Sequence, residues 1–188
     1  MNSLKENFPL SALDQQAISE LLALSKEKDD PWLVACSGGA DSIFLSHLLN
    51  AHFPNKISLI HFNHKIRASD SDKDELFVEK LAKNLDIPFI SASNHPKNDL
   101  KSEEDARNAR LSFFKQTYCQ EKAAALIQGH HSHDVAESIT MRITRGTNTI
   151  GLAAPRPIHY HKLDQNDIRS NMLILRPLLT LCPNEIKE

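Results

Sequence analysis

The chain is poor in cysteine and glycine, and it has no apolar run long enough to cross a membrane. Its first residues also lack the apolar stretch of a secretory signal, so the sequence predicts a cytoplasmic protein. Cys36, Cys119 and Cys182 form no Cys-x-x-Cys pair, which argues against a zinc ribbon and against a redox pair. An odd number of scattered cysteines is typical of a reducing compartment.

A surplus of basic charge is also missing. The formal net charge is −2 at pH 7 and the isoelectric point is about 6.5. The overall charge therefore gives no support for nucleic-acid binding, which usually shows a basic excess. The arginines of the last quarter leave two alternatives open, a local basic patch or a solvated surface with ion pairs. They are Arg142, Arg145, Arg156, Arg169 and Arg176.

The 188 residues, of which 40% are hydrophobic and 24% charged, are typical of one globular domain with its own core. Apolar strand-like runs alternate with helical patterns along the chain, which predicts an α/β fold with a parallel sheet and helices on both faces. Strands are expected at 32–36, 57–62, 87–92, 123–128 and 174–179. Helices are expected after Ser11 and at 42–52, 70–84, 102–121 and 132–145, and 147–171 is expected to be a loop.

Two of the five glycines stand between the first expected strand and the helix after it, in Ser37-Gly38-Gly39-Ala40-Asp41-Ser42. Backbone amides at such a helix start favour a bound phosphate, and glycine allows a ligand to approach closely. The serine hydroxyls add donors, and the Asp41 carboxylate is suited to Mg²⁺. The segment lacks the Walker A lysine and the dinucleotide glycine spacing. The alternative is an ordinary turn that uses glycine for its geometry.

A cluster of histidines and carboxylates follows the fourth expected strand, from Gly129 to Glu137. On a helix, His130 and Asp134 would share a face, as would His133 and Glu137. Three interpretations stay open here: a transition-metal site that also uses His131, acid–base chemistry in which Asp134 orients His130, or a capped helix start with exposed histidines.

Polar side chains also end the second expected strand, where ligands bind in parallel sheets. His61, Asn63 and His64 are expected to line a pocket, although Asn63 is equally suited to turn hydrogen bonds. Lys65 and Arg67 add positive charge there.

Two further arginines, Arg107 and Arg110, are three residues apart on one expected helix, beside Glu104. They predict either substrate binding or a surface ladder of ion pairs.

Together these motifs resemble one protein family. The segment 37–42 is similar to the S-G-G-x-D-S signature of the N-type ATP pyrophosphatases, the PP-loop family, whose fold is Rossmann-like. Other segments resemble one branch of that family, the tRNA(Ile)-lysidine synthases. They are 61–67, with Ile66 in place of leucine, 104–110, 129–138, 145–146, 151–153 and 176–179. The resemblance covers residues 32 to 181.

The resemblance implies a two-step reaction on tRNA(Ile) with a CAU anticodon. ATP adenylates the C2 carbonyl oxygen of the wobble cytidine, pyrophosphate leaves, and the amine of L-lysine then attacks C2 and expels AMP. The implied cofactors are ATP and Mg²⁺, with Asp41 as a metal ligand. Asp41, His130 and Asp134 are the implied catalytic residues, and 37–42 with Asn63 are the implied ATP-binding residues. The implied substrate-binding residues are His61, His64, Arg67, Arg107, Arg110, Glu137 and Arg145.

The chain departs from the branch pattern at three positions. His133 replaces an aspartate and removes a negative charge, Val135 replaces a glutamine and removes an amide, and Ser138 replaces a threonine. A catalytically silent ATP-binding module is therefore one alternative function. A tRNA thiolase is another, although the chain lacks the paired cysteines that such enzymes commonly carry.

The expected organisation is an N-terminal lead and helix at 1–30, a PP-loop ATP-binding catalytic domain at 31–181 and a tail at 182–188. Family members usually continue into a helical tRNA-binding domain, which we expect to be absent from this chain. Whether the chain forms a homodimer is left open by the sequence.

Overall fold

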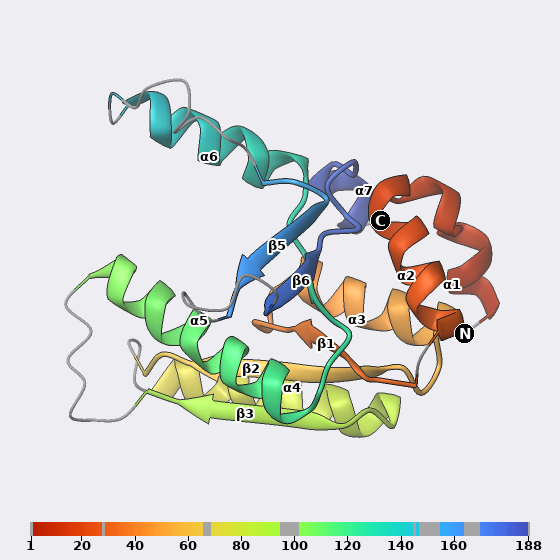
Figure 1. Ribbon diagram of the computed structural model, residues 1–188, viewed down its shortest axis with the longest axis horizontal. Helices are drawn as coiled ribbons and strands as arrows, with labels where there is room; N and C mark the ends of the chain where they lie inside the picture. The colour runs from red at the N-terminus through yellow and green to blue at the C-terminus, as the bar shows by residue number, and fades with distance from the viewer. Residues whose placement is uncertain are drawn as a thin grey trace.

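The computed structural model describes residues 2–27, 29–65, 69–94, 102–144, 146, 155–163 and 170–187. Its centre is a six-stranded sheet of order β3-β2-β1-β4-β6-β5, in which every neighbouring pair is parallel except β5 and β6 (Figure 1). The strands are β1 Trp32–Ala35, β2 Ile57–Asn63, β3 Phe89–Ser93, β4 Ala125–Gln128, β5 Ile158–Lys162 and β6 Asn171–Leu175. The predicted α/β class with a mostly parallel sheet is confirmed.

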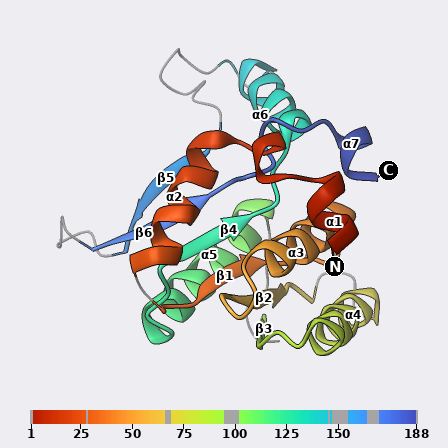
Figure 2. The same ribbon diagram turned by 90° about the vertical axis from the view of Figure 1, so that its right-hand side faces the viewer.

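Helices cover both faces of the sheet, as predicted, and α2 and α5 lie on opposite sides of it in Figure 2. The helices are α1 Asn2–Asn7, α2 Gln15–Glu27, α3 Ala40–His52, α4 Ser69–Leu85, α5 Glu103–Gln120, α6 Ser132–Thr144 and α7 Pro183–Lys187, with a 3₁₀ turn at Leu10–Ala12. Among the described helices, none has the length and apolar character needed to cross a membrane.

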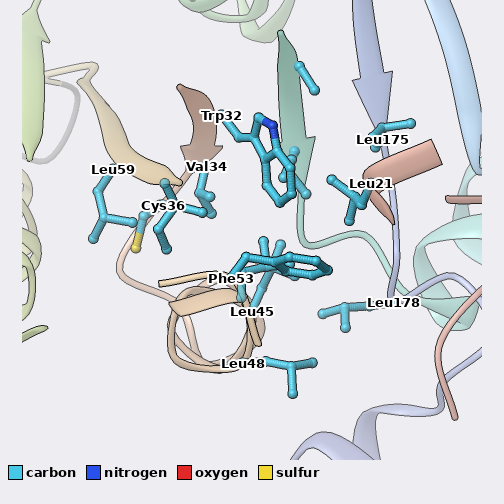
Figure 3. Packing of buried hydrophobic residues seen from close by; sticks show 14 of the residues in the cluster. Leu21, Trp32, Val34, Cys36, Leu45, Leu48, Phe53, Leu59, Leu175 and Leu178 are labelled. Atoms are coloured by element: carbon cyan, nitrogen blue, oxygen red, sulfur yellow. The ribbon is translucent and has the colours of Figure 1, made fainter. Parts of the chain in front are cut away.

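The strands alternate their side chains between two cores, because successive residues of a strand point to opposite faces. Trp32 and Val34 of β1 join the larger core under α2, α3 and α4, whereas Leu33 joins the smaller core under α5. In the larger core, the rings of Trp32 and Phe53 meet edge to face with centroids 4.9 Å apart, close to Leu45 (Figure 3). Full burial of each such side chain contributes about 1.5–3 kcal/mol, so both faces of the central strands are fixed.

Two expectations about the C-terminal part of the sheet were wrong. β5 lies within 147–171, which the sequence predicts to be a loop. The prediction misses the strand because its sequence, Ile-His-Tyr-His-Lys, has polar groups on both faces. This pattern suits an edge strand, and β5 pairs with β6 alone. β6 begins and ends earlier than predicted, because the chain leaves the sheet after Leu175 and turns at 177–180.

The cap of α2 also differs from the prediction. Asp14, and not Ser11, caps this helix, since its Oδ1 atom accepts the backbone N–H groups of Gln16 (3.0 Å) and Ala17 (3.2 Å). Ser11 lies one turn earlier, in the 3₁₀ turn. The predicted cap of α5 is confirmed, because Ser102 Oγ accepts the N–H of Asp105 at 3.1 Å.

Candidate functional site

A cleft of about 310 Å³ opens at the carboxyl ends of β1, β2 and β4, where ligands bind in sheets of this type. Most of the predicted site residues line it: Ser37, Gly39, Asp41, Ser42, His61, Asn63, His64, Arg110, His130 and Asp134. Gly38, Ala40, Arg107 and Glu137 are not part of this lining. Arg67 and Arg145 lie outside the described residues. The structure thus brings together segments that are far apart in the sequence.

The loop from Ser37 to Ser42 is held in shape by the Ser42 hydroxyl. Ser42 Oγ donates to the Gly39 carbonyl at 2.8 Å and accepts the Ser37 N–H at 3.2 Å. Gly39 is the N-cap of α3, and in the described residues no side chain caps the first turn of this helix. The first backbone amides of α3 are therefore suited to an anionic group in the cleft.

Two glycines allow this loop to pack closely against its neighbours. Gly38 has a φ angle of +91°, which an L side chain rarely adopts. Gly129, directly after β4, touches the start of α3: a Cβ atom there would lie 3.3 Å from the Asp41 carbonyl oxygen and 3.4 Å from Ser42 Cα. Gly129 thus sets how closely the end of β4 approaches the loop.

The sequence interpretation missed the role of His131, whose ring lies between the two predicted catalytic carboxylates. Its Nε2 atom is 3.5 Å from Asp41 Oδ2, and its Nδ1 atom is 3.4 Å from Asp134 Oδ2. Asp134 Oδ2 also accepts the His131 backbone N–H at 2.7 Å. His131 therefore links the start of α3 to the start of α6. The two adjacent histidines of the motif make either His130 or His131 a candidate partner of Asp134, but the helical spacing favours His130.

That spacing argument fails because α6 begins at Ser132, so His130 precedes the helix. The contacts of Asp134 in the described residues are with His131 and not with His130. Burial, and then the charge of Arg176, lower the pKa of His130 to about 4, although Asp134 acts in the opposite direction. His130 is therefore a neutral imidazole at pH 7.

His61 and Asn63 hold the rim of the cleft in place. The Nδ1 atom of the buried His61 is 2.8 Å from the Cys36 carbonyl oxygen, which ties β2 to the loop after β1. The Asn63 amide donates to Asp72 (2.9 Å) and Glu75 (2.8 Å), and its oxygen accepts the Lys65 N–H at 2.9 Å. The turn hydrogen bond weighed for Asn63 is thus present. Its side chain is already bonded on both sides, so its predicted contact with ATP has no direct support in these bonds.

Several buried polar atoms of the cleft have no hydrogen-bond partner among the described residues. They are His64 Nδ1, Gln128 Oε1 and His130 Nδ1. Burial, and then the charge of Arg110, lowers the pKa of His64. Because buried polar groups are nearly always hydrogen-bonded, these atoms fit a polar ligand.

A transition-metal site built from the histidine cluster finds no support in the structure. Within the described ranges, no group of three His, Cys, Asp or Glu side chains is arranged to hold a metal ion. Three of the described carboxylates line the cleft, those of Asp41, Asp74 and Asp134. Carboxylate oxygens are donors of the kind that Mg²⁺ prefers when phosphates complete its shell.

Comparison with known proteins agrees with this geometry. Residues 12–188 match a family model described as a PP-loop domain. The chain is 34% identical to the tRNA(Ile)-lysidine synthase of Caldanaerobacter subterraneus subsp. tengcongensis and 38% identical to that of Clostridioides difficile. Each alignment covers 86% of this chain and 34% of the relative, so the chain spans about a third of the length of these curated relatives.

Two solved structures share the fold. The U34-tRNA thiolase NcsA of Methanococcus maripaludis superimposes with a TM-score of 0.62 at 16% identity, over 92% of this chain and 60% of that chain. The NH3-dependent NAD synthetase of Campylobacter jejuni gives a TM-score of 0.54 at 14% identity, over 92% and 67%. At such identities the likeness concerns the fold alone.

Proposed function

The chain belongs to the family of PP-loop domains, and on that premise we propose that it catalyses the ATP-dependent ligation of L-lysine to a tRNA base. The base is the wobble cytidine in the CAU anticodon of tRNA(Ile). Its C2 carbonyl oxygen is adenylated first, and lysine then attacks C2. Support comes from relatives named tRNA(Ile)-lysidine synthase, which match over most of this chain. The observation that carries the proposal is that the loop 37–42 opens on one cleft with His130, Asp134 and Arg110.

In this proposal the loop binds the phosphates of ATP. The amides at the start of α3 and the exposed Ser37 hydroxyl donate to them, while Ser42 keeps the loop in shape. When the bond to the α-phosphate breaks, negative charge grows on the departing pyrophosphate. Donors already in position stabilise this charge without reorganisation.

Asp41 and Asp134 are the residues proposed to hold Mg²⁺. When bound, the ion would neutralise phosphate charge. The ring of His131 lies between the two carboxylates and contacts both. Asp41 stays a proposed metal ligand, and Asp134 is proposed as a second one.

His130 is proposed to bind substrate as a neutral hydrogen-bonding group. With a pKa of about 4 it is a weak base, so removal of the lysine ammonium proton is not assigned to it in the free protein. Its unpartnered Nδ1 atom is suited to a polar group of the nucleotide or of the cytidine.

The test is incorporation of labelled lysine into a tRNA(Ile) transcript with a CAU anticodon, in the presence of ATP and Mg²⁺. Asp41→Asn is expected to lower incorporation by about 10²–10³-fold, the effect of losing one electrostatic contact in the transition state. Asp29→Asn is the matched control, because Asp29 is exposed and pairs with Lys56 before β2 begins. ATP binding without incorporation by the unaltered chain would favour the silent module, and no ATP binding at all would overturn the proposal.

A further inference from the structure

Arginine, lysine and histidine side chains extend from the cleft across the α5 side of the sheet to the edge strand β5. We call this group the basic strip. Its members are Arg107, Arg110 and Lys115 of α5, Arg156 before β5, His159 and His161 of β5, and Arg176 after β6. Arg110 lines the cleft, so the strip begins at the site already described.

The strand register places the two histidines on the α5 side. His159 lies opposite Ile174 and His161 opposite Met172, and residues opposite one another in an antiparallel pair share a face. Ile174 and Met172 belong to the smaller core with Phe114 of α5. The two histidine rings have centroids 6.1 Å apart.

Among the described residues, no carboxylate pairs with the strip. In the described part of the chain, none of its members forms an ion pair, although Glu103, Glu104 and Asp105 occupy the first turn of α5. Arg176 Nη1 donates to the Arg156 carbonyl at 2.9 Å, and its buried Nε atom has no partner among the described residues. A chain of net charge −2 thus gathers arginine and lysine side chains on one side, where no described carboxylate pairs with them.

The electrostatic effects of these groups on one another agree with this arrangement. Burial and then Arg107 lower the pKa values of both Arg110 and Arg176. Burial also lowers the pKa of His159 and of His161, and nearby arginines and Lys115 add to the effect. Burial is the larger cause in each case, and it favours the neutral form of the two histidines. Arg107 also repels Arg110 and Arg176, and an anionic ligand would relieve this repulsion.

We propose that the basic strip binds the phosphate backbone of the RNA whose base enters the cleft. Arg107 and Lys115 are eight residues apart, about 12 Å along the axis of α5, which exceeds the size of a single phosphate. The strip is continuous with the cleft through Arg110, as a polymer with one base in the site requires. Such contacts position an RNA without reading its sequence. The inference rests on the proposed function, since it presumes an RNA substrate.

The experiment measures binding of an unmodified tRNA(Ile) transcript to the full chain over a range of salt concentrations. The double variant Lys115→Gln with Arg156→Gln is compared with Lys26→Gln with Lys83→Gln, whose lysines lie on α2 and α4, over the larger core. We expect the strip variant to bind about tenfold more weakly at 0.1 M salt, with a salt slope reduced by about 2. The control should keep the dissociation constant and slope of the unaltered chain, and all three should bind ATP equally.

Equal tRNA affinity and equal salt slope in both double variants would overturn the basic strip. The basic strip would also be overturned if the unaltered chain bound ATP but no tRNA at low salt. The same holds if it bound an acidic polypeptide such as polyglutamate in place of tRNA. Neither of these two results would argue against the ATP site. Salt-dependent tRNA binding that needs the strip, in a chain that binds no ATP, would instead support the strip and refute the proposed function.

Discussion

Gly129 is the residue at which a single added methyl group tests how closely the loop must pack. In Gly129→Ala, the new Cβ atom would lie 3.3 Å from the Asp41 carbonyl oxygen, 3.4 Å from the Asp41 carbonyl carbon and 3.4 Å from Ser42 Cα. All three neighbours are backbone atoms, which cannot rotate away as a flexible side chain can. The start of α3 must therefore shift by a few tenths of an ångström, and with it the loop that lines the cleft.

The expected cost follows from this geometry. Overpacking of this kind costs about 1–3 kcal/mol. For a chain of this length a loss of about 2 kcal/mol lowers Tm by about 4–8 °C. If ATP binds at the start of α3, the same shift misplaces its amide donors. A tenfold weaker dissociation constant for ATP, about 1.4 kcal/mol, is the expected result.

Thermal unfolding followed by circular dichroism and titration calorimetry with ATP measure the two effects. Gly146→Ala is the matched control: Gly146 has a φ angle of +70° and no described atom within 4 Å of an added Cβ. It should lose about 1 kcal/mol of stability through backbone strain and keep its ATP affinity. If Gly129→Ala leaves both Tm and ATP affinity unchanged, close packing of β4 against α3 does not position the loop.

Two further predictions concern the cap of α2 and the titration of His130. Asp14→Ala should lower the free energy of unfolding by about 1 kcal/mol in urea titrations, since two amides lose their acceptor; Ser11→Ala should change it little, and the reverse order would reinstate Ser11 as the cap. Because His130 has a pKa of about 4 when folded against 6.5 ordinarily, the unfolded chain binds the proton first as pH falls. His130 should therefore lower stability between pH 6.5 and 4 by up to about 1.4 kcal/mol per pH unit. Urea titrations of His130→Gln at pH 7 and pH 5 should show a smaller loss than the unaltered chain, and an equal loss would contradict the assignment.

Local patterns were sufficient where an element's own residues decide its state. The central strands, buried on both faces, are continuous apolar runs, and the sequence places β1, β2 and β4 to within one or two residues. β5 was missed because an edge strand needs no apolar run, and its histidines and Tyr160 resemble loop residues. Asp14 was missed as a cap because a bend at Leu13 sets where α2 begins. The spacing of apolar residues along the helix does not predict that bend.

The candidate site divides in the same way. The loop 37–42 was found from the sequence because a phosphate-binding turn is local, and its glycines, serines and aspartate are consecutive. The position of His131 between Asp41 and Asp134 depends on how α3 and α6 pack, so spacing along one helix pointed to His130 instead. The occupied hydrogen bonds of Asn63 likewise depend on α4, which contributes Asp72 and Glu75.

By itself, the sequence determined the alternation of strands and helices and the chemistry of the loop, because both are set by neighbouring residues. Only the tertiary structure decided which polar groups share the cleft and which cations gather in the basic strip. Arg107, Arg156 and Arg176 come from segments far apart in the chain, and the sheet order brings them to one side. The strength of an electrostatic interaction depends on distance in space, which sequence separation does not reveal.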